Sequence, residues 1–215
     1  MRAGAQNNEF FSGLKPLMGA MIGAGCGLSS ISFYTHGAFV VSVSSNTGWS
    51  RGDVQLGVSI MILMAIITAP IVGVLVDRFG ARRVALISIP LYGLSMGSFY
   101  FLSTSLSAYY LAWSIMSVLA AGTLPVTWTR VGNGWFEKHR GIALGITLAG
   151  TGFAATLAPT YVTWLITEFG WQKAYLLLAL TITLIGFPGV YFLFFESKNN
   201  NSKESFNKEQ KETNT

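Results

Sequence analysis

The sequence has few charged residues and almost no cysteine. Only 11% of its 215 residues are charged, whereas soluble domains carry about 25%. The single cysteine, Cys26, lies in an apolar run, so no disulfide framework or cysteine-based metal site is available. Every Asp and Glu falls outside the apolar runs, and no Walker-type loop, catalytic triad or cluster of metal ligands occurs. These absences argue against an ATPase, another enzyme or a metalloprotein, and we expect no catalytic residue, no metal and no cofactor.

Apolar residues make up 51% of the chain, and they include 13% aromatic residues. This composition is typical of a membrane protein, with lipid as its surroundings. The formal net charge of +5 would lie on one exposed face in a nucleic-acid-binding protein, but here it lies in loops and in the tail. Membrane orientation explains that distribution better, so we expect no nucleic-acid partner.

The apolar residues form long runs, each near or above the ~20 residues that cross a bilayer as a helix. The first run is longer than the core of a cleaved signal peptide and is therefore interpreted as a membrane helix. We expect six transmembrane helices, at about 16–43, 54–76, 84–102, 108–131, 141–167 and 171–195. The predicted fold is an all-α membrane protein with a cytoplasmic segment over 1–15, a bundle over 16–195 and a disordered cytoplasmic tail over 196–215.

One short polar stretch, Gly73 to Arg83, interrupts the apolar sequence with the pattern G-x-x-x-D-R-x-G-x-R-R. Its charges and loop backbone would have no partners in hydrocarbon, so it must be a tight turn at a membrane face. Gly73 permits a close helix approach, and Gly80 can adopt a positive φ. Asp77, at a helix end, can bind Arg82 or Arg83, or face the N-terminus of a neighbouring helix.

The basic residues predict the orientation. With the N-terminus inside, eleven of the fourteen Lys and Arg residues lie in inner segments, Arg51 and Lys173 lie in outer loops, and Arg130 lies in a helix. The positive-inside rule then places both termini in the cytoplasm. We expect a multi-pass protein of the cell membrane.

A weak internal repeat supports a construction from three plus three helices. The stretch from Asp77 to Arg83 resembles the stretch from Thr167 to Lys173, and a proline precedes each by a similar distance. The first turn would face inward and the second outward, as an inverted repeat requires.

The Gly73–Arg83 pattern resembles the loop between helices 2 and 3 of the major facilitator superfamily of transporters. The resemblance implies that this loop latches two halves of a transporter together on the cytoplasmic side. The latch residues would be the following: Gly73, Asp77, Arg78, Gly80, Arg82 and Arg83. The polar tail after about residue 197 resembles the start of the linker that joins the two six-helix halves in this superfamily.

Shorter phrases resemble the branch of monocarboxylate transporters and oxalate/formate antiporters. They are Gly48 to Arg51, Arg130 to Gly145, Gly150 to Gly152, and Pro159. Sugar porters usually carry Pro-Glu-Ser-Pro-Arg after helix 6, and the stretch from Phe195 to Lys198 keeps only two of those residues.

Two ionisable residues lie within the predicted spans. Arg130 either snorkels to the interface or pairs with Asp77 or Glu137, or it faces the cavity and binds a substrate carboxylate with its guanidinium fork. His36, next to Tyr34, is either a packed, hydrogen-bonded residue or a cavity residue that binds substrate or carries a proton. Arg130, His36 and Tyr34 are therefore the candidate substrate-binding residues.

Together these features predict the N-terminal half of a secondary transporter that works by alternating access. The expected solute is a small organic anion such as a monocarboxylate, and the expected partner is a second six-helix half or another copy. The alternative is a truncated or accessory six-helix membrane protein without transport activity of its own.

Overall fold

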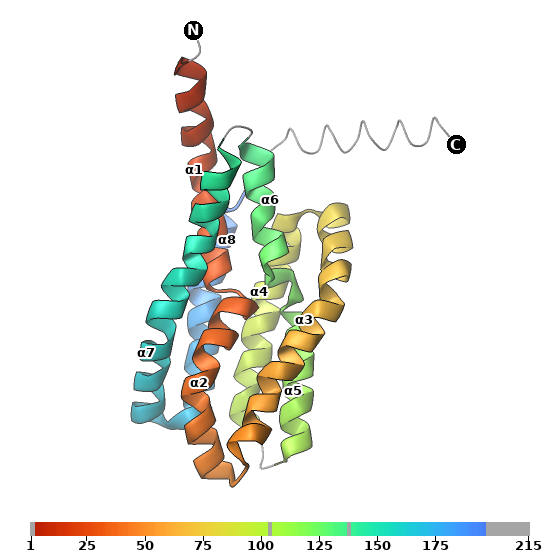
Figure 1. Cartoon of the computed structure of the whole chain (residues 1–215), viewed down its shortest axis with the longest axis vertical. Helices are drawn as coiled ribbons and strands as arrows, with labels where there is room; N and C mark the ends of the chain where they lie inside the picture. Colours follow the sequence, from red (N-terminus) through yellow and green to blue (C-terminus); the bar gives the residue numbers. More distant parts are fainter. Residues whose placement is uncertain (1–2, 103–104, 137–138, 197–215) are drawn as a thin grey trace, which may run out of the picture.

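A computed structural model describes residues 3–102, 105–136 and 139–196, and these residues are almost entirely helical (Figure 1). No strand occurs among them, which confirms the predicted all-α class. The α-helices are α1 (Ala3–Gly25), α2 (Leu28–Thr47), α3 (Arg51–Phe79), α4 (Ala81–Gly97), α5 (Leu106–Leu119), α6 (Pro125–Trp135), α7 (Arg140–Thr181) and α8 (Phe187–Leu193). Two 3-10 helices, η1 (Ser98–Phe101) and η2 (Ala121–Thr123), and a π-helix, η3 (Ile182–Gly186), complete them.

Four helical segments of the described chain are long and apolar enough to cross a membrane. They are Gly13–Thr47, Arg51–Phe79, Ala81–Phe101 and Arg140–Leu193. The first and the last exceed the length that one crossing requires. The chain is therefore built from membrane-spanning helices, and breaks within the long segments decide how many crossings it makes.

Two of the predicted helices are each divided by a break. Pro125 divides the predicted fourth helix: it begins α6, and the residue before it, Leu124, is extended with φ −66° and ψ 157°. A residue before proline avoids the helical region, and proline suits the first position of a helix. The predicted first helix is divided at Cys26 and Gly27, where α1 ends and α2 begins.

The two breaks contact each other. The Leu28 amide donates to Thr123 Oγ1 at 3.0 Å. A Cβ atom built on Gly27 would lie 2.6 Å from the Thr123 carbonyl oxygen, so only glycine allows this approach. The break between α1 and α2 and the break between α5 and α6 therefore lie side by side in the bundle.

The long helix α7 contains a turn at Gly170, which has φ 79° and ψ 160°. Figure 1 shows α7 running along the bundle and then returning beside itself toward α8. Gly80, between α3 and α4, has nearly the same backbone angles, φ 87° and ψ 147°. This conformation is essentially restricted to glycine. The predicted positive φ of Gly80 is confirmed, and the turns at Gly80 and Gly170 share one backbone geometry.

The first helix starts earlier than expected, at Ala3 rather than near Pro16. Pro16 lies inside α1. Membrane helices tolerate an internal proline when neighbouring groups replace the lost hydrogen bond. The predicted disordered tail lies outside the described residues, apart from Glu196.

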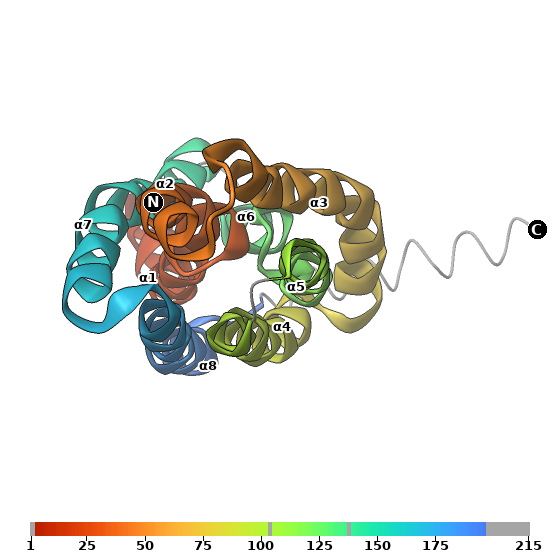
Figure 2. The ribbon, with the colours of Figure 1, turned by 90° about the horizontal axis from the view of Figure 1, so that it is seen from below.

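Glycine contacts hold α1 against the rest of the bundle. A Cβ atom on Gly19 would lie 2.6 Å from the Phe194 amide nitrogen, and one on Gly25 would lie 2.9 Å from the Gly150 carbonyl oxygen. Figure 2 shows α3 and α7 on opposite sides of the bundle, with α1 and α2 between them. Small residues at these contacts let the helix backbones approach closely, as membrane helices require.

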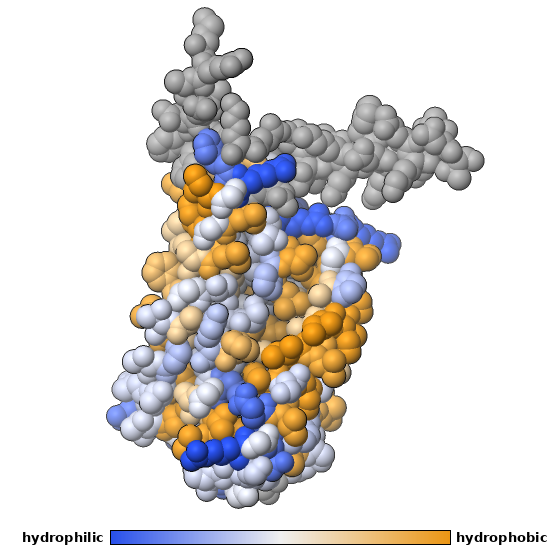
Figure 3. Space-filling view, in the orientation of Figure 1, coloured by the Kyte–Doolittle hydropathy of each residue, from blue (hydrophilic) through white to orange (hydrophobic). Residues whose placement is uncertain are grey.

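The surface of α3 is apolar over most of its length, and hydrophilic residues gather at the two ends of the molecule (Figure 3). The exposed α3 side chains include Leu63, Ile66, Ile67, Ile71 and Val74. Exposure of such a large apolar face to water would cost much free energy, so lipid or another protein must cover it.

Candidate functional site

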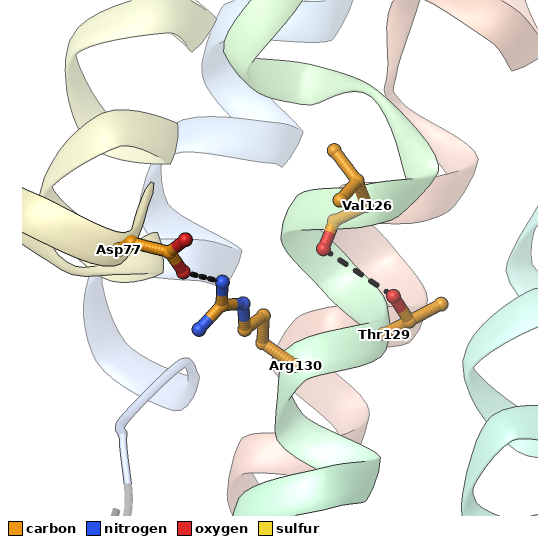
Figure 4. A network of polar contacts seen from close by, with 4 residues as sticks. All are labelled: Asp77, Val126, Thr129 and Arg130. Carbon is orange, nitrogen blue, oxygen red and sulfur yellow. Dashed lines mark hydrogen bonds and ion pairs between the residues drawn. The ribbon is translucent and has the colours of Figure 1, made fainter. Parts of the chain in front are cut away.

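The polar turn of the sequence lies at one end of the bundle, where an ion pair joins two helices. The Asp77 carboxylate, in the last turns of α3, pairs with the Arg130 guanidinium on α6 (Figure 4). The Asp77 side chain is 58% exposed and that of Arg130 is 30% exposed. The pair is therefore a contact at the rim of the bundle and not a buried one.

This pairing corrects one expectation and selects between others. For Asp77, Arg82, Arg83 or the N-terminus of a neighbouring helix were the partners considered at the turn itself, but its ion-pair partner is Arg130. Arg82 and Arg83 lie beyond the Gly80 turn, in the first turn of α4. Of the arrangements considered for Arg130, pairing with Asp77 is the one observed; Glu137 lies outside the described residues.

Arg82 binds α8 and the residues that follow it. Its Nη2 donates to the Tyr191 carbonyl oxygen at 2.8 Å, and its guanidinium lies 4.3 Å from the centre of the Phe195 ring. Its backbone amide donates to Glu196 Oε1 at 3.2 Å. The Glu196 carboxylate thus lies at the N-terminus of α4, where the helix dipole favours negative charge.

The residues after α8, Phe195 and Glu196, also contact α6 and the Gly80 turn. Trp135 Nε1 donates to the Phe195 carbonyl oxygen at 2.9 Å. A Cβ atom on Gly80 would lie 2.7 Å from Glu196 Oε2. We name this set the arginine end, defined by the residues Asp77, Gly80, Arg82, Arg130, Trp135, Phe195 and Glu196. It links α3, α4, α6 and the chain after α8.

Sequence reasoning missed Glu196 and Phe195 as members of this set. The available signal was a carboxylate directly after the last apolar run, close to the end of the membrane span. Its partner could not be inferred, because 114 residues separate Glu196 from Arg82.

The other predicted latch residues do not join these contacts. Gly73 has no atom within 4 Å of a built Cβ, so the expected close helix approach at Gly73 does not occur within this part of the chain. The Arg78 guanidinium lies 5.3 Å from the ring centre of its neighbour Phe79. Arg83 is exposed.

His36 and Tyr34 lie on different faces of α2. The His36 side chain is buried, with its ring edge-to-face with Trp113 and the ring centres 5.2 Å apart. Neither of its ring nitrogens has a hydrogen-bond partner of good geometry. Tyr34 is exposed and packs edge-to-face with Phe33. The structure therefore does not bring these two residues into one site, and His36 is packed but not hydrogen-bonded.

Comparisons with known proteins identify the class to which this architecture belongs. Residues 22–214 match the model of the Major Facilitator Superfamily. The chain belongs to this superfamily, whose members are transporters and not enzymes. Its apolar helices make it an integral membrane protein.

Individual relatives agree with that assignment. An "MFS-type transporter" of Gibberella moniliformis is 31% identical over 185 residues, which cover 82% of this chain and 42% of the relative. The "MFS-type transporter opdF" of Penicillium oxalicum is 28% identical over 142 residues, covering 63% of this chain and 33% of the relative. "Monocarboxylate transporter 14" of Homo sapiens is 26% identical over 135 residues, which cover 60% of this chain and 25% of the relative. The chain thus spans less than half the length of these relatives.

Proposed function

We propose that the chain is the N-terminal six-helix half of a secondary active transporter that works by alternating access. Six crossings follow if α1 with α2, α3, α4 with η1, α5 with α6, the first part of α7, and the second part of α7 with α8 each cross once. The observation that carries the proposal is the arginine end, which ties helices together through charges at one face of the bundle.

The two glycine turns support a three-plus-three inverted repeat. Gly80 and Gly170 occupy equivalent positions in the repeated stretches and share a backbone conformation that favours glycine. Figure 1 shows the two turns at opposite ends of the bundle. An inverted repeat requires equivalent turns on opposite faces of the membrane.

In this proposal the arginine end is a cytoplasmic latch. The excess of basic residues in the segments at this end favours a cytoplasmic location for it and for both termini. The Asp77–Arg130 pair is partly exposed, so it can exchange partners at small cost when the two halves of a transporter rock against each other. Such exchangeable contacts suit a gate better than a permanent support.

A small organic anion such as a monocarboxylate is the proposed solute. The relative named as a monocarboxylate transporter supports this class. An Arg130 fork that binds a substrate carboxylate would first have to release Asp77, which makes substrate binding and gate opening two competing uses of one guanidinium. The alternative function is an accessory or truncated membrane protein, and the exposed apolar face of α3 would then be its contact surface.

The test is uptake by vesicles. The tagged chain is purified in mild detergent from the membranes in which it is made, with and without its associated proteins, and each preparation is reconstituted. We expect saturable uptake of a labelled monocarboxylate by the complex and none by the isolated chain, because alternating access needs two bundles. Asp77→Asn should slow this uptake, whereas the matched control Asp53→Asn, at the opposite end of α3, should not.

Two results would contradict this proposal. Saturable uptake by the isolated chain would show that one six-helix unit, as a monomer or homodimer, transports without a second half. Failure of the complex to take up any anion would favour the accessory alternative.

A further inference from the structure

A groove lies on one face of the bundle, where α2, α3 and α6 meet (Figure 1). Its volume is about 360 Å³, near the lower limit of sites that hold an organic ligand. We call this space the apolar groove; its walls come from residues within 28–33, 61–69 and 124–126. Among the residues that line it, Ser29 is the only one with a polar side chain.

The apolar groove lies at the two helix breaks. Leu28, on its wall, is the first residue of α2 and follows the break after α1. Leu124 and Pro125, also on its wall, form the break before α6. In secondary transporters the solute binds beside helices that are interrupted in this way. The position of the groove therefore suits a solute.

A guanidinium lies one helical turn from the apolar groove. Val126 lines the groove, and Arg130 follows it by four residues on α6, so the two side chains lie on the same side of the helix. About 6 Å of helix separates them, and helical side chains lean toward the N-terminus, here toward the groove. Figure 4 shows Arg130 reaching from α6 to Asp77 of α3. The ion pair thus lies beyond one end of the groove.

The row of α3 residues between the groove and the ion pair leaves space. Ala69 lines the groove, Gly73 follows it by one turn and Asp77 by two turns, so these residues lie in one row along the helix. A Cβ atom built on Gly73 would meet no described atom within 4 Å. Because Gly73 has no side chain, this row does not separate the apolar groove from the Asp77–Arg130 pair.

The charge and the groove together select an anion that has a hydrocarbon part. A carboxylate matches the paired N–H groups of Arg130, whereas polar groups on the rest of a solute would lose water without gaining partners on these walls. Ile66 and Val126 of the walls are 65% and 38% exposed, and an alkyl chain or a ring placed against them buries apolar surface on both sides. A phospholipid with two long acyl chains is too large for a groove of this volume.

We propose that the solute is an amphiphilic monocarboxylate, with a single alkyl chain or aromatic ring, whose hydrocarbon part fills the apolar groove. Its carboxylate replaces Asp77 on the Arg130 guanidinium, and its tail lies between α2 and α3. The wall from Met61 to Ala69 spans about 12 Å along α3, so the groove selects for chain length. This selection rests on the proposed function, in which Arg130 binds a transported carboxylate.

The experiment measures binding and needs no transport. Radiolabelled carboxylates are bound at neutral pH to the complex in lipid nanodiscs, and binding to empty nanodiscs is subtracted. The series is acetate, butyrate, hexanoate, octanoate and palmitate, which share a head group and differ in chain length. From butyrate to octanoate, each step of two methylenes should tighten binding about tenfold. Palmitate, which is longer than the groove, should bind no more tightly than octanoate, and uncharged hexanamide should bind at least about tenfold more weakly than hexanoate.

Matched variants locate the tail and the head group. Ala69→Leu fills part of the apolar groove, so it should weaken octanoate binding about tenfold or more and leave acetate binding unchanged, a pattern that misfolding does not produce. Val74→Leu is the control, because Val74 is 66% exposed on α3 and lies outside the groove; it should change neither. Arg130→Gln should remove the difference between hexanoate and hexanamide.

Several results would overturn this proposal. One is an affinity that does not depend on chain length, and another is a dependence that Ala69→Leu leaves intact, because the tail would then bind elsewhere. Tighter binding of palmitate than of octanoate would make the groove a site for lipid. Binding by the isolated chain and not by the complex would show that a partner covers the groove.

The binding series and the vesicle uptake fail separately. If the complex binds the series as expected but the vesicles show no uptake, the apolar groove stands as a binding site and the proposed transport function fails. If the vesicles take up a monocarboxylate but binding does not depend on chain length, the transport function stands and the proposed solute class is wrong.

Discussion

The two ends of this bundle have turns of the same shape and opposite chemistry. At the arginine end, the Gly80 turn lies among Arg82, Glu196 and the Asp77–Arg130 pair. At the other end, the Gly170 turn is followed by Trp171, which packs edge-to-face with Tyr175. Tyr175 belongs to a buried set of rings, which we call the aromatic cluster: His36, Phe39, Phe99, Tyr109, Trp113 and Tyr175. Charges hold one end, and buried rings and neutral hydroxyls hold the other.

This difference separates a fixed end from an exchangeable one. Buried rings gain free energy from close packing and lose it when any ring is removed. Partly exposed ion pairs contribute little to stability because water and salt compete for the charges. We therefore infer that the aromatic cluster stabilises the bundle, while the arginine end controls which conformation the whole transporter adopts.

The largest effect should come from Trp113→Ala in the aromatic cluster. Trp113 is 1% exposed and contacts the rings of His36, Phe99 and Tyr109, so its removal leaves a cavity that should cost about 3–5 kcal/mol. The measurement is the free energy of unfolding in mixed detergent micelles, followed by circular dichroism. The matched control is Trp135→Ala at the arginine end, where the indole is half-buried and makes a hydrogen bond to Phe195. A larger loss for Trp135 than for Trp113 would reverse the comparison.

A smaller effect should come from the two glycine turns. Alanine at Gly80 or Gly170 must adopt a conformation that costs a side chain roughly 1–3 kcal/mol. Gly80→Ala should cost more than Gly170→Ala, because its Cβ would lie 2.7 Å from Glu196 Oε2, whereas no atom lies within 4 Å at Gly170. The same unfolding measurement checks both. Gly73→Ala, a helical glycine with nothing within 4 Å, is the control and should be neutral or stabilising.

The outcome for this glycine pair tests the repeat as well as the contacts. Equal losses would show that Glu196 does not rest against the Gly80 turn. No loss at Gly170 would show that the turn is not held in the glycine-restricted conformation, and the structural argument for an inverted repeat would then fail.

The sequence predicted the all-α class, the presence of long apolar helices and the Gly80 conformation, because these follow from local composition and from one tight turn. It did not predict the break between α5 and α6, although Pro125 was visible, because prolines also lie inside the uninterrupted parts of α3 and α4. It indicated Arg130 as a partner of Asp77 only as one of several arrangements, and it did not predict the contacts of Arg82. Both contacts join residues more than fifty positions apart. Because several basic and acidic residues could have formed these contacts, the sequence did not show which of them pair.

The smallest effect should be that of the Asp77–Arg130 pair on stability, even though we assign it the largest role in gating. A double-mutant cycle of Asp77→Asn and Arg130→Gln isolates the coupling between the two charges. Because both side chains are substantially exposed, we expect a coupling of about 0.2–1 kcal/mol that shrinks as salt is added. The cycle is measured by unfolding in micelles at low and high ionic strength. Exchange of the two charges, Asp77→Arg with Arg130→Asp, should recover the coupling, since the pair contributes through charge rather than through shape. A coupling of several kcal/mol that salt does not change would mean that the pair supports the fold as the aromatic cluster does, and the division of the bundle into a fixed and an exchangeable end would be wrong.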